Sequence, residues 1–350
     1  NTLVISLSVC LEICVSKHVL GAGSIGCYVA GCLLASDPTL SAANALTLIG
    51  RQRLYDDITA NGLKVTDWQG REQLTKPEHI AFSIENDSLV DADVILLCVK
   101  SQDTEQAAAI INQHAKQSAV VVSLQNGVGN AHLLRQHIKQ CVIAGMVPFN
   151  VFYKGNGHFH CGTEGNIALE DPNNQCSDVI KALSNASLPV TVYNDMKAVQ
   201  YGKLIMNLNN AVNALSGIPL KSQLGDRQYR LVMAKVLSEA LAVLKAEGIA
   251  PARTGKVIPK LMPKIMKLPN FLFNVVASST LKIDPEARSS MYEDLALGRR
   301  TEIDYLNGEI VRLGEKNNIA TPVNKHIVNL IKQHEVAQKG SPHLPANALL

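Results

Sequence analysis

The sequence predicts an α/β fold, with a doubly wound sheet in the N-terminal part and an all-helical C-terminal domain. Three observations predict it. A glycine-rich loop begins at Gly21 and leads directly into a helical pattern. The apolar runs at 92–99 and 119–124 are nearly continuous, as in buried strands of parallel sheets. From about Asp195 onward, strand patterns give way to helical periodicity.

The composition indicates a globular protein and excludes several kinds of partner. The chain has 350 residues, of which 47% are hydrophobic and 18% charged, enough for two domains with a sizeable core. The net charge of +3 is too close to neutral to indicate a nucleic-acid binder. Aromatic residues make up only 4%, which argues against base-stacking surfaces. We therefore expect a small-molecule ligand and no nucleic acid.

Segment 1–16 is apolar apart from Glu12 and lacks a basic start, so it is either a leader or an extra strand. No apolar run reaches the ~20 residues that span a bilayer, and we expect no membrane partner. The eight cysteines form no C-x-x-C pair, which predicts reduced thiols and a cytoplasmic location. His158 and His160 share a strand face. We expect no metal there, because no acidic or cysteine ligand stands at the spacing that metal sites need.

The glycine loop fits the pattern G-x-G-x-x-G of dinucleotide-binding βαβ units. Its first glycine allows a sharp turn, its second lets the backbone approach a pyrophosphate, and its third lets the helix pack on the sheet. The phosphates then lie at the helix N-terminus, where free N–H groups favour an anion. The expected cofactor-binding residues of the loop are Gly21, Ala22, Gly23, Ser24, Ile25 and Gly26.

The strand predicted at 45–50 ends in Arg51, where NAD-preferring units place an acid that binds the ribose. A basic residue here suits a 2′-phosphate, so Arg51 indicates NADP. The alternative is a solvated loop arginine.

Two later strands end in polar residues. The run at 92–99 closes on Lys100, and the run at 119–124 closes on Gln125 and Asn126. Ligands of such sheets bind beyond the carboxyl ends of the strands, so Lys100 and Asn126 are candidate site residues; the alternative is that each caps a strand. Further strands are predicted at 142–147, 166–169 and 190–193. Together these segments predict a Rossmann-like NADP-binding domain at 17–194.

Helical patterns fill 195–336, the predicted substrate and catalytic domain. Helices are expected at 199–215, 227–247 and 323–335, and within a long segment that contains 291–313. The tail at 337–350 contains Gly340, Pro342 and Pro345, and we expect it to be flexible.

Lys203, Asn207 and Asn210 are spaced i, i+4 and i+7, so they share one face of a predicted helix that is otherwise apolar. Asparagine is a poor helix former, so three polar residues on this face need an explanation. They could form a solvent-exposed face of the helix, but a polar stripe that faces a cleft fits the apolar surroundings better.

At these residues the chain resembles the ketopantoate reductases (2-dehydropantoate 2-reductases) of pantothenate and coenzyme A biosynthesis. The resemblance implies NADPH-dependent reduction of the ketone of 2-dehydropantoate to (R)-pantoate. The matching pieces, in chain order, are the glycine loop, Val99-Lys100, Gln125-Asn126-Gly127, the stretch from Lys203 to Asn207, Ser289-Ser290-Met291, and the stretch from Thr301 to Tyr305.

The resemblance also implies roles for single residues. Lys203 is the general acid and Asn207 binds substrate. Lys100 and Asn126 lie beside the nicotinamide ribose and the substrate. Ser290 contacts the substrate carboxylate. Glu302 holds the substrate hydroxyl or the cofactor ribose, and we count it with Lys203 as catalytic.

One position departs from the family pattern. Many members carry a second asparagine four residues after the first, where this chain has Ala211. Asn210 and Asn213 flank it, and either is a candidate for binding substrate.

Two other functions stay open: a related reductase of another 2-oxo acid or an imine, and a non-catalytic NADP-sensing protein. A general acid argues against the sensor, which needs none. The long helical half also offers surface for a homodimer.

Overall fold

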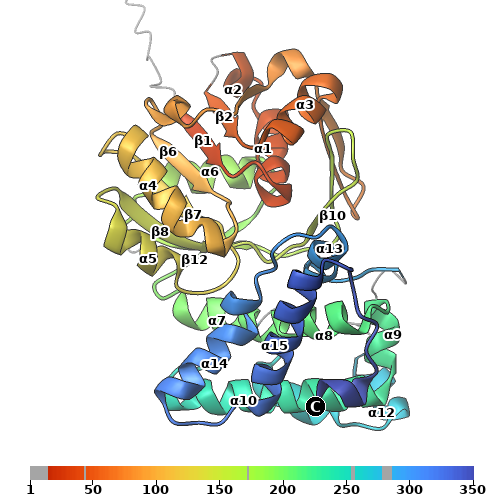
Figure 1. Ribbon diagram of the computed structural model, residues 1–350. Helices are drawn as coiled ribbons and strands as arrows, with labels where there is room; N and C mark the ends of the chain where they lie inside the picture. The colour runs from red at the N-terminus through yellow and green to blue at the C-terminus, as the bar shows by residue number, and fades with distance from the viewer. Residues whose placement is uncertain (1–14, 43–44, 172, 254–256, 278–285) are drawn as a thin grey trace, which may run out of the picture.

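The computed structural model describes residues 15–42, 45–171, 173–253, 257–277 and 286–350 (Figure 1). A sheet domain is followed by a helical domain, as predicted, and the two lie one below the other in Figure 1. Segment 1–14, which contains Cys10, Cys14 and most of the predicted leader, lies outside the described residues.

The main sheet has the strand order β12-β11-β8-β7-β6-β1-β2-β5. The six strands from β8 to β5 are parallel, whereas β11 runs antiparallel to β8 and pairs in parallel with β12. The doubly wound sheet is thus confirmed, with a reversed edge that strand patterns alone do not encode. The bounds are β1 Lys17–Leu20, β2 Leu46–Ile49, β5 Ala81–Ser83, β6 Val94–Leu97, β7 Val120–Ser123, β8 Cys141–Met146, β11 Ile167–Glu170 and β12 Val190–Tyr193.

Helices cover both faces of this sheet. On one face α1 (Ser24–Ser36) and α6 (Ser177–Asn185) share a core with the strands. On the other face, α4 (Thr104–His114) and α5 (Asn130–His137) enclose a second core. Helix α3 (Gln52–Asn61) directly follows β2.

A second, four-stranded sheet of order β4-β3-β10-β9 packs beside α1. Its strands are β3 (Leu63–Asp67), β4 (Glu72–Thr75), β9 (Val151–Tyr153) and β10 (His158–Cys161). Strands β3 and β10 pair in parallel, with His158 opposite Lys64, although more than 90 residues separate these two partners in the chain. His158 and His160 do share a face, where Thr66 Oγ1 lies 2.8 Å from a ring nitrogen of each. No group of three potential metal ligands occurs in the described ranges.

The helical domain has one large core, around the 20-residue helix α10. The helix predicted at 199–215 is divided at Leu208, and the segment containing 291–313 holds two helices with a 3₁₀ turn between them. Helix α13 ends just before Gly298, whose φ of +61° closes the helix. The helices are α7 Lys197–Asn207, α8 Asn209–Ser216, α9 Leu220–Gly225, α10 Arg227–Ala246, α11 Met262–Met266, α12 Asn270–Val276, α13 Ser290–Ala296, α14 Asn307–Lys316 and α15 Pro322–Ala337. No helix in the described part of the chain is long and apolar enough to cross a membrane.

The C-terminal tail contradicts the expectation that it is flexible. After α15 the chain turns back across the helical domain, and the Leu344 N–H donates to the Leu215 carbonyl at 2.8 Å. The Tyr229 hydroxyl donates to the Leu344 carbonyl, also at 2.8 Å. Leu349 is fully buried in the domain core. The glycine and prolines suggested a loose segment, but the apolar residues between them find a place in that core.

We expect Leu349→Ala to lower the free energy of unfolding of the helical domain by about 2–4 kcal/mol, because it leaves a cavity in a closed core. Leu350→Ala is the matched control, because Leu350 is 50% exposed, and it should change stability by less than about 0.5 kcal/mol. Urea denaturation followed by circular dichroism measures both. Equal effects of the two substitutions would contradict the docked tail.

Candidate functional site

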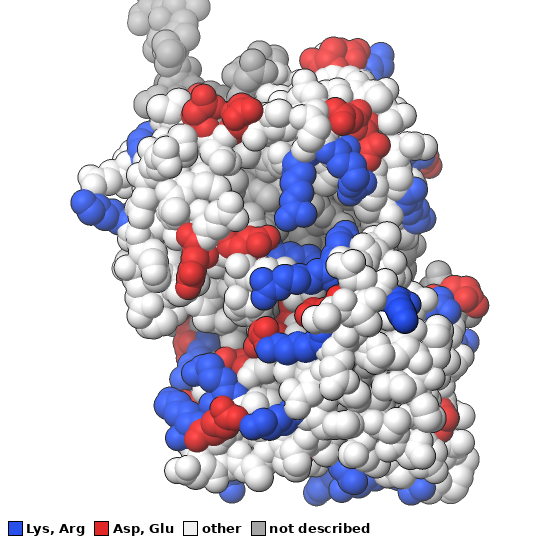
Figure 2. Space-filling model, in the orientation of Figure 1, with Lys and Arg blue, Asp and Glu red and all other residues white. Residues whose placement is uncertain are grey.

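The candidate site lies at the carboxyl edge of the parallel strands, against the helical domain. Strands β1, β6 and β7 end level with one another, because Leu20 pairs with Leu97 and Leu97 with Ser123. Strand β8 runs two residues farther, from Ala144, the partner of Ser123, to Met146. The loops after these strands therefore share one edge of the sheet. Figure 2 shows Lys and Arg side chains gathered around a hollow between the two domains.

Of the three glycines in the loop after β1, only Gly23 faces open space. A Cβ on Gly21, whose φ is +95°, would lie 2.6 Å from the Val99 nitrogen. A Cβ on Gly26 would lie 2.6 Å from the Gly21 carbonyl oxygen. A Cβ on Gly23 would meet nothing closer than 4.0 Å. The first and third glycines are thus required by packing, and the second faces open space.

Helix α1 begins directly behind this open space. Gly23 is its N-cap, no side chain caps the first turn, and that turn contains no acidic residue. The first N–H groups of a helix have no carbonyl partner within the helix. The space beside Gly23 therefore adjoins free amide donors and the positive end of the helix dipole, which suits an anion.

Lys203 projects from α7 onto the sheet edge and is almost completely buried, with 9% of its surface exposed. Its ammonium donates to Asn126 Oδ1 at 3.0 Å and to the Val147 carbonyl oxygen. Burial lowers the pKa of Lys203 to about 8, and the negative charge of Glu302 partly offsets this shift. An ammonium in this state is charged at neutral pH and gives up its proton more readily than an exposed lysine.

Asn126 is held in place from behind. Its backbone carbonyl accepts from the Ser101 hydroxyl at 2.7 Å and from Asn130 Nδ2 at 2.6 Å. The following residue, Gly127, has a φ of +81°, which turns the chain sharply after the amide. The Asn126 side chain is thereby directed at Lys203.

Glu302 lies in the helical domain and contacts the sheet domain through its carboxylate. Glu302 Oε1 accepts from the Ser101 N–H at 3.2 Å. The neighbouring Thr301 is buried, and its N–H donates to the Glu335 carboxylate at 2.7 Å. The position of Glu302 is thus fixed on both sides of the domain boundary.

Lys100 has a different environment from the one expected for a residue beside a nicotinamide. Its ammonium donates to Asp294 Oδ2 at 2.7 Å and to the Arg300 carbonyl at 3.0 Å. Arg299 Nε lies 3.1 Å from the other Asp294 oxygen. Burial raises the pKa of Asp294, while Lys100 and Arg299 act in the opposite direction. Lys100 therefore links the sheet domain to α13.

The asparagine stripe divides into two parts. Asn207 and Asn210 are half-buried, on either side of the break at Leu208. Asn213 is fully buried: its Nδ2 donates to the Ile218 carbonyl and to Gln223 Oε1, both at 2.9 Å.

The Asn213 side-chain oxygen accepts from the Ser289 N–H at 2.8 Å. Both amide donors are then in use, so the expectation that Asn213 binds substrate is wrong. Asn210 remains the candidate.

The two serines before Met291 also differ. Ser289 is buried and caps α13, because its Oγ accepts from the Tyr292 N–H at 3.2 Å. It also donates to the Asn210 carbonyl at 2.9 Å. Ser290 is exposed at the first position of the helix. Its hydroxyl is the one of the two that solvent can reach.

Arg51 stands between β2 and α3, and its side chain is 88% exposed. Its guanidinium forms a long ion pair with Asp103, in which Arg51 Nη2 lies 3.9 Å from Asp103 Oδ2. Arg51 is accordingly available for a ligand at the sheet edge.

Family models match both domains of the chain. Residues 17–174 match the model described as "Ketopantoate reductase PanE/ApbA", and residues 195–335 match the model of its C-terminal domain. The chain belongs to the ketopantoate reductase family. It is therefore an oxidoreductase of that family.

Relatives and solved structures agree with this family. A 2-dehydropantoate 2-reductase of Halobacterium salinarum is 27% identical over 90% of this chain and 97% of its own length. The crystal structure of a family member from Ralstonia eutropha JMP134 is 30% identical, covers 92% of this chain and 99% of its own, and superposes with a TM-score of 0.76. A ternary structure of D-mandelate dehydrogenase with NADH and anilino(oxo)acetate shares the fold, with 21% identity, 92% and 99% coverage and a TM-score of 0.73.

The ketopantoate reductase family implies a nicotinamide dinucleotide cofactor. The residues present fit such a group, because Gly23 provides open space at the uncapped N-terminus of α1. Ala22, Ser24 and Ile25 complete the loop that would hold the pyrophosphate.

Three contributors to the site were not predicted from the sequence: Asp294, Ser101 and the Val147 carbonyl. Asp294 stands four residues after Ser290, on the same helical face, and this spacing was the available signal. Ser101 and Val147 act through hydroxyl and backbone groups whose positions depend on the fold.

We expect Lys100→Met to destabilise the protein by about 1–3 kcal/mol at pH 8, because it removes a cation from the buried carboxylate of Asp294. This loss of stability should become smaller as the pH falls, because a protonated Asp294 needs no cation beside it. Urea denaturation of the wild type and the variant between pH 5 and pH 8 measures the difference in the free energy of unfolding. The control Lys116→Met breaks an exposed pair with Asp93 and should cost less than about 1 kcal/mol. A loss independent of pH would contradict this assignment.

Proposed function

We propose that this protein catalyses the NADPH-dependent reduction of 2-dehydropantoate to (R)-pantoate, with Lys203 as the general acid. The observation that carries the proposal is the burial of Lys203 at the sheet edge, with its ammonium bonded to Asn126 Oδ1 and the Val147 carbonyl. The family and its named relatives support the substrate and the reaction.

The chemistry needs a proton donor beside a ketone. A nicotinamide cofactor held at the glycine loop would supply a hydride to the ketone carbon, so that negative charge would develop on the ketone oxygen. The Lys203 ammonium stabilises that charge and donates its proton to the oxygen, so it acts as an electrostatic catalyst and as an acid. Its lowered pKa favours the transfer. Asn126 orients the ammonium through the 3.0 Å hydrogen bond.

Glu302 supports the acid in two ways. Its negative charge raises the pKa of Lys203, against the effect of burial, and so favours the protonated form. Its carboxylate also offers an acceptor for a substrate hydroxyl or a cofactor ribose, in addition to the Ser101 N–H that it already binds. These two effects are the reason for counting Glu302 as catalytic.

Substrate contacts would come from the helical domain. The exposed hydroxyl of Ser290 suits the substrate carboxylate, and Asn207 and Asn210 offer amide donors from the adjoining helices. On the cofactor side, the exposed guanidinium of Arg51 suits the 2′-phosphate of NADPH. With Lys100 committed to Asp294, we assign Lys100 a supporting position at the nicotinamide end of the cofactor site.

The direct test is the consumption of NADPH, followed at 340 nm, with 2-dehydropantoate as substrate. We expect saturable turnover with NADPH, a kcat/KM at least about tenfold lower with NADH, and (R)-pantoate as the product by chiral chromatography. No turnover with either cofactor would refute the proposal.

Lys203→Ala should lower kcat by about 10²–10⁴-fold, because the acid and its charge are both removed. NADPH binding, measured by fluorescence titration, should change little. Lys197→Ala is the matched control, as an exposed lysine at the start of the same helix, and should retain activity within about twofold. Near-normal turnover in Lys203→Ala would sink the assignment of the acid.

The rate of reduction should depend on pH through Lys203. Since its pKa is about 8, kcat should be constant below that pH and fall about tenfold per unit above it, as the ammonium loses its proton. In Glu302→Gln the carboxylate no longer raises this pKa, so the fall should begin at a lower pH. An unchanged or higher midpoint in Glu302→Gln would contradict the proposed coupling.

Arg51→Ala should raise KM for NADPH about tenfold or more and leave KM for NADH nearly unchanged, because only NADPH carries the 2′-phosphate. Steady-state kinetics with both cofactors measures the two constants. Equal changes in the two constants would remove Arg51 from the phosphate site.

A second candidate function is the reduction of another 2-oxo acid. The observation that favours it is the small number of free amide groups on the substrate side of the site. Ala211 is buried there, and the Asn213 side chain is hydrogen-bonded to Gln223 and Ser289. Fewer amide donors then face the substrate than in family members with two asparagines. Comparing kcat/KM for 2-dehydropantoate with that for phenylglyoxylate and 2-oxoisovalerate decides between the two functions.

A further inference from the structure

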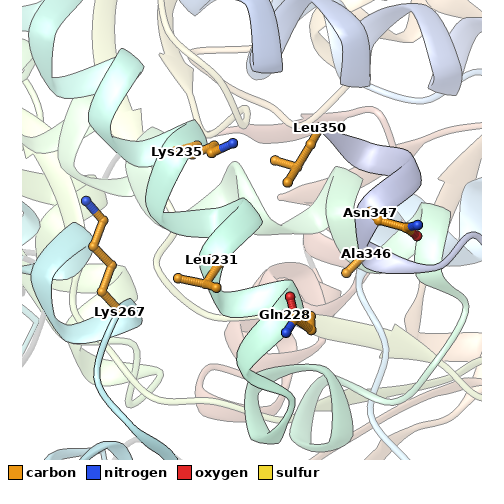
Figure 3. Close-up of a pocket in the computed structure, with 7 residues that line it drawn as sticks. All are labelled: Gln228, Leu231, Lys235, Lys267, Ala346, Asn347 and Leu350. Atoms are coloured by element: carbon orange, nitrogen blue, oxygen red, sulfur yellow. The ribbon is translucent and has the colours of Figure 1, made fainter.

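A cavity in the helical domain lies apart from the candidate site and contains none of the residues assigned to the reaction. It has a volume of about 290 Å³, between α10 and the C-terminal turn Ala346–Leu349, and it is shown in Figure 3. This is close to the lower end of the range for small-molecule sites, about 300–1,000 Å³. The docked C-terminal tail therefore forms one wall of a space of ligand size.

One face of α10 forms another wall of this cavity. Gln228, Leu231 and Lys235 are spaced i, i+3 and i+7, which places them in a row on the same side of the helix. At a rise of 1.5 Å per residue, this row is about 10 Å long. Its middle is apolar, and Ala346 and Leu350 continue the apolar surface on the side of the tail.

Positive charge stands at one end of the row and negative charge at the other. Lys235 extends from α10 toward Leu350 in Figure 3, whereas Lys267, directly after α11, lines the cavity but points its ammonium away from Leu350. Within the described ranges the Lys235 ammonium forms no ion pair with an acidic side chain. At the Gln228 end, this cavity adjoins a neighbouring cavity of about 370 Å³, which is lined by Asp226. An anionic group is thus attracted to the lysine end and repelled from the Asp226 end.

We propose that this cavity binds a small amphiphilic carboxylate. Its carboxylate lies at Lys235, and its apolar body lies along Leu231 toward the tail. The ammonium of Lys235 supplies the preference for an anion, and the apolar row supplies the preference for a hydrocarbon body. Gln228 and Asn347 offer amide groups to a polar atom farther along the ligand. This site is independent of the proposed reaction.

The test uses the full chain and octanoate as the probe, with acetate as a probe that has the charge and no apolar body. Saturation-transfer difference NMR should show saturable binding of octanoate and none of acetate at the same concentrations. Raising the salt concentration should weaken octanoate binding, because the head group is held by partly exposed charges.

Lys235→Gln should weaken octanoate binding about fivefold or more, and Leu231→Gln should do so as well, by making the apolar row polar. Lys245→Gln is the matched control, because Lys245 is an exposed lysine in the last turn of the same helix, and it should leave binding unchanged. Circular dichroism and urea denaturation of each variant confirm that the variant is folded. Acetate binding as tight as octanoate, or octanoate binding that neither Lys235→Gln nor Leu231→Gln weakens, would overturn the proposal.

Discussion

The buried ammonium of Lys203 is the interaction on which the site depends. A lysine charge taken out of water is costly unless oxygen atoms replace its hydration. The helix that carries Lys203 supplies none of them; the oxygens come from Asn126 and Val147, at the ends of strands β7 and β8. The position of α7 against the sheet edge is thus a condition for keeping this lysine charged. The same burial brings its pKa close to physiological pH.

Two further contacts join the domains beside it. The Lys100 ammonium reaches Asp294 on α13, and the neighbouring Ser101 N–H reaches Glu302. Both sheet-domain residues follow β6, so one short loop holds two parts of the helical domain. Ser101 also binds the backbone of Asn126 through its hydroxyl, which connects this loop to the acceptor of Lys203. A movement that opened the site would break these contacts together, so ligand binding and the alignment of Lys203 are expected to be coupled.

Much of this arrangement could be predicted from the sequence, and the failures have physical causes. The apolar runs specified the central strands, and strand ends marked Asn126 because all parallel strands present their carboxyl ends at one edge. Strand direction at the β11 edge and the second sheet depend on pairing between distant segments, which periodicity does not encode. Asn213 lies three residues beyond Asn210, yet it is buried among Gln223 and Ser289, and only the tertiary structure reveals those partners. Lys100 stood at the predicted edge, but its carboxylate partner lies almost 200 residues away in the chain.

The contrast between the two lysines explains why only one suits proton transfer. Lys100 is bonded directly to the buried carboxylate of Asp294. Loss of its proton would leave Asp294 with Arg299 as its only remaining ionic partner among the described residues, so the surroundings oppose that loss. Lys203 is bonded to neutral oxygens, and the negative charge of Glu302 acts on it without a direct hydrogen bond. When Lys203 loses its proton, no ion pair is broken, and the free-energy cost of burying a charge is removed. The acceptors therefore give the two ammonium groups at this sheet edge different roles: Lys100, bonded to a carboxylate, suits holding the domains together, and Lys203, bonded to neutral oxygens, suits giving up a proton.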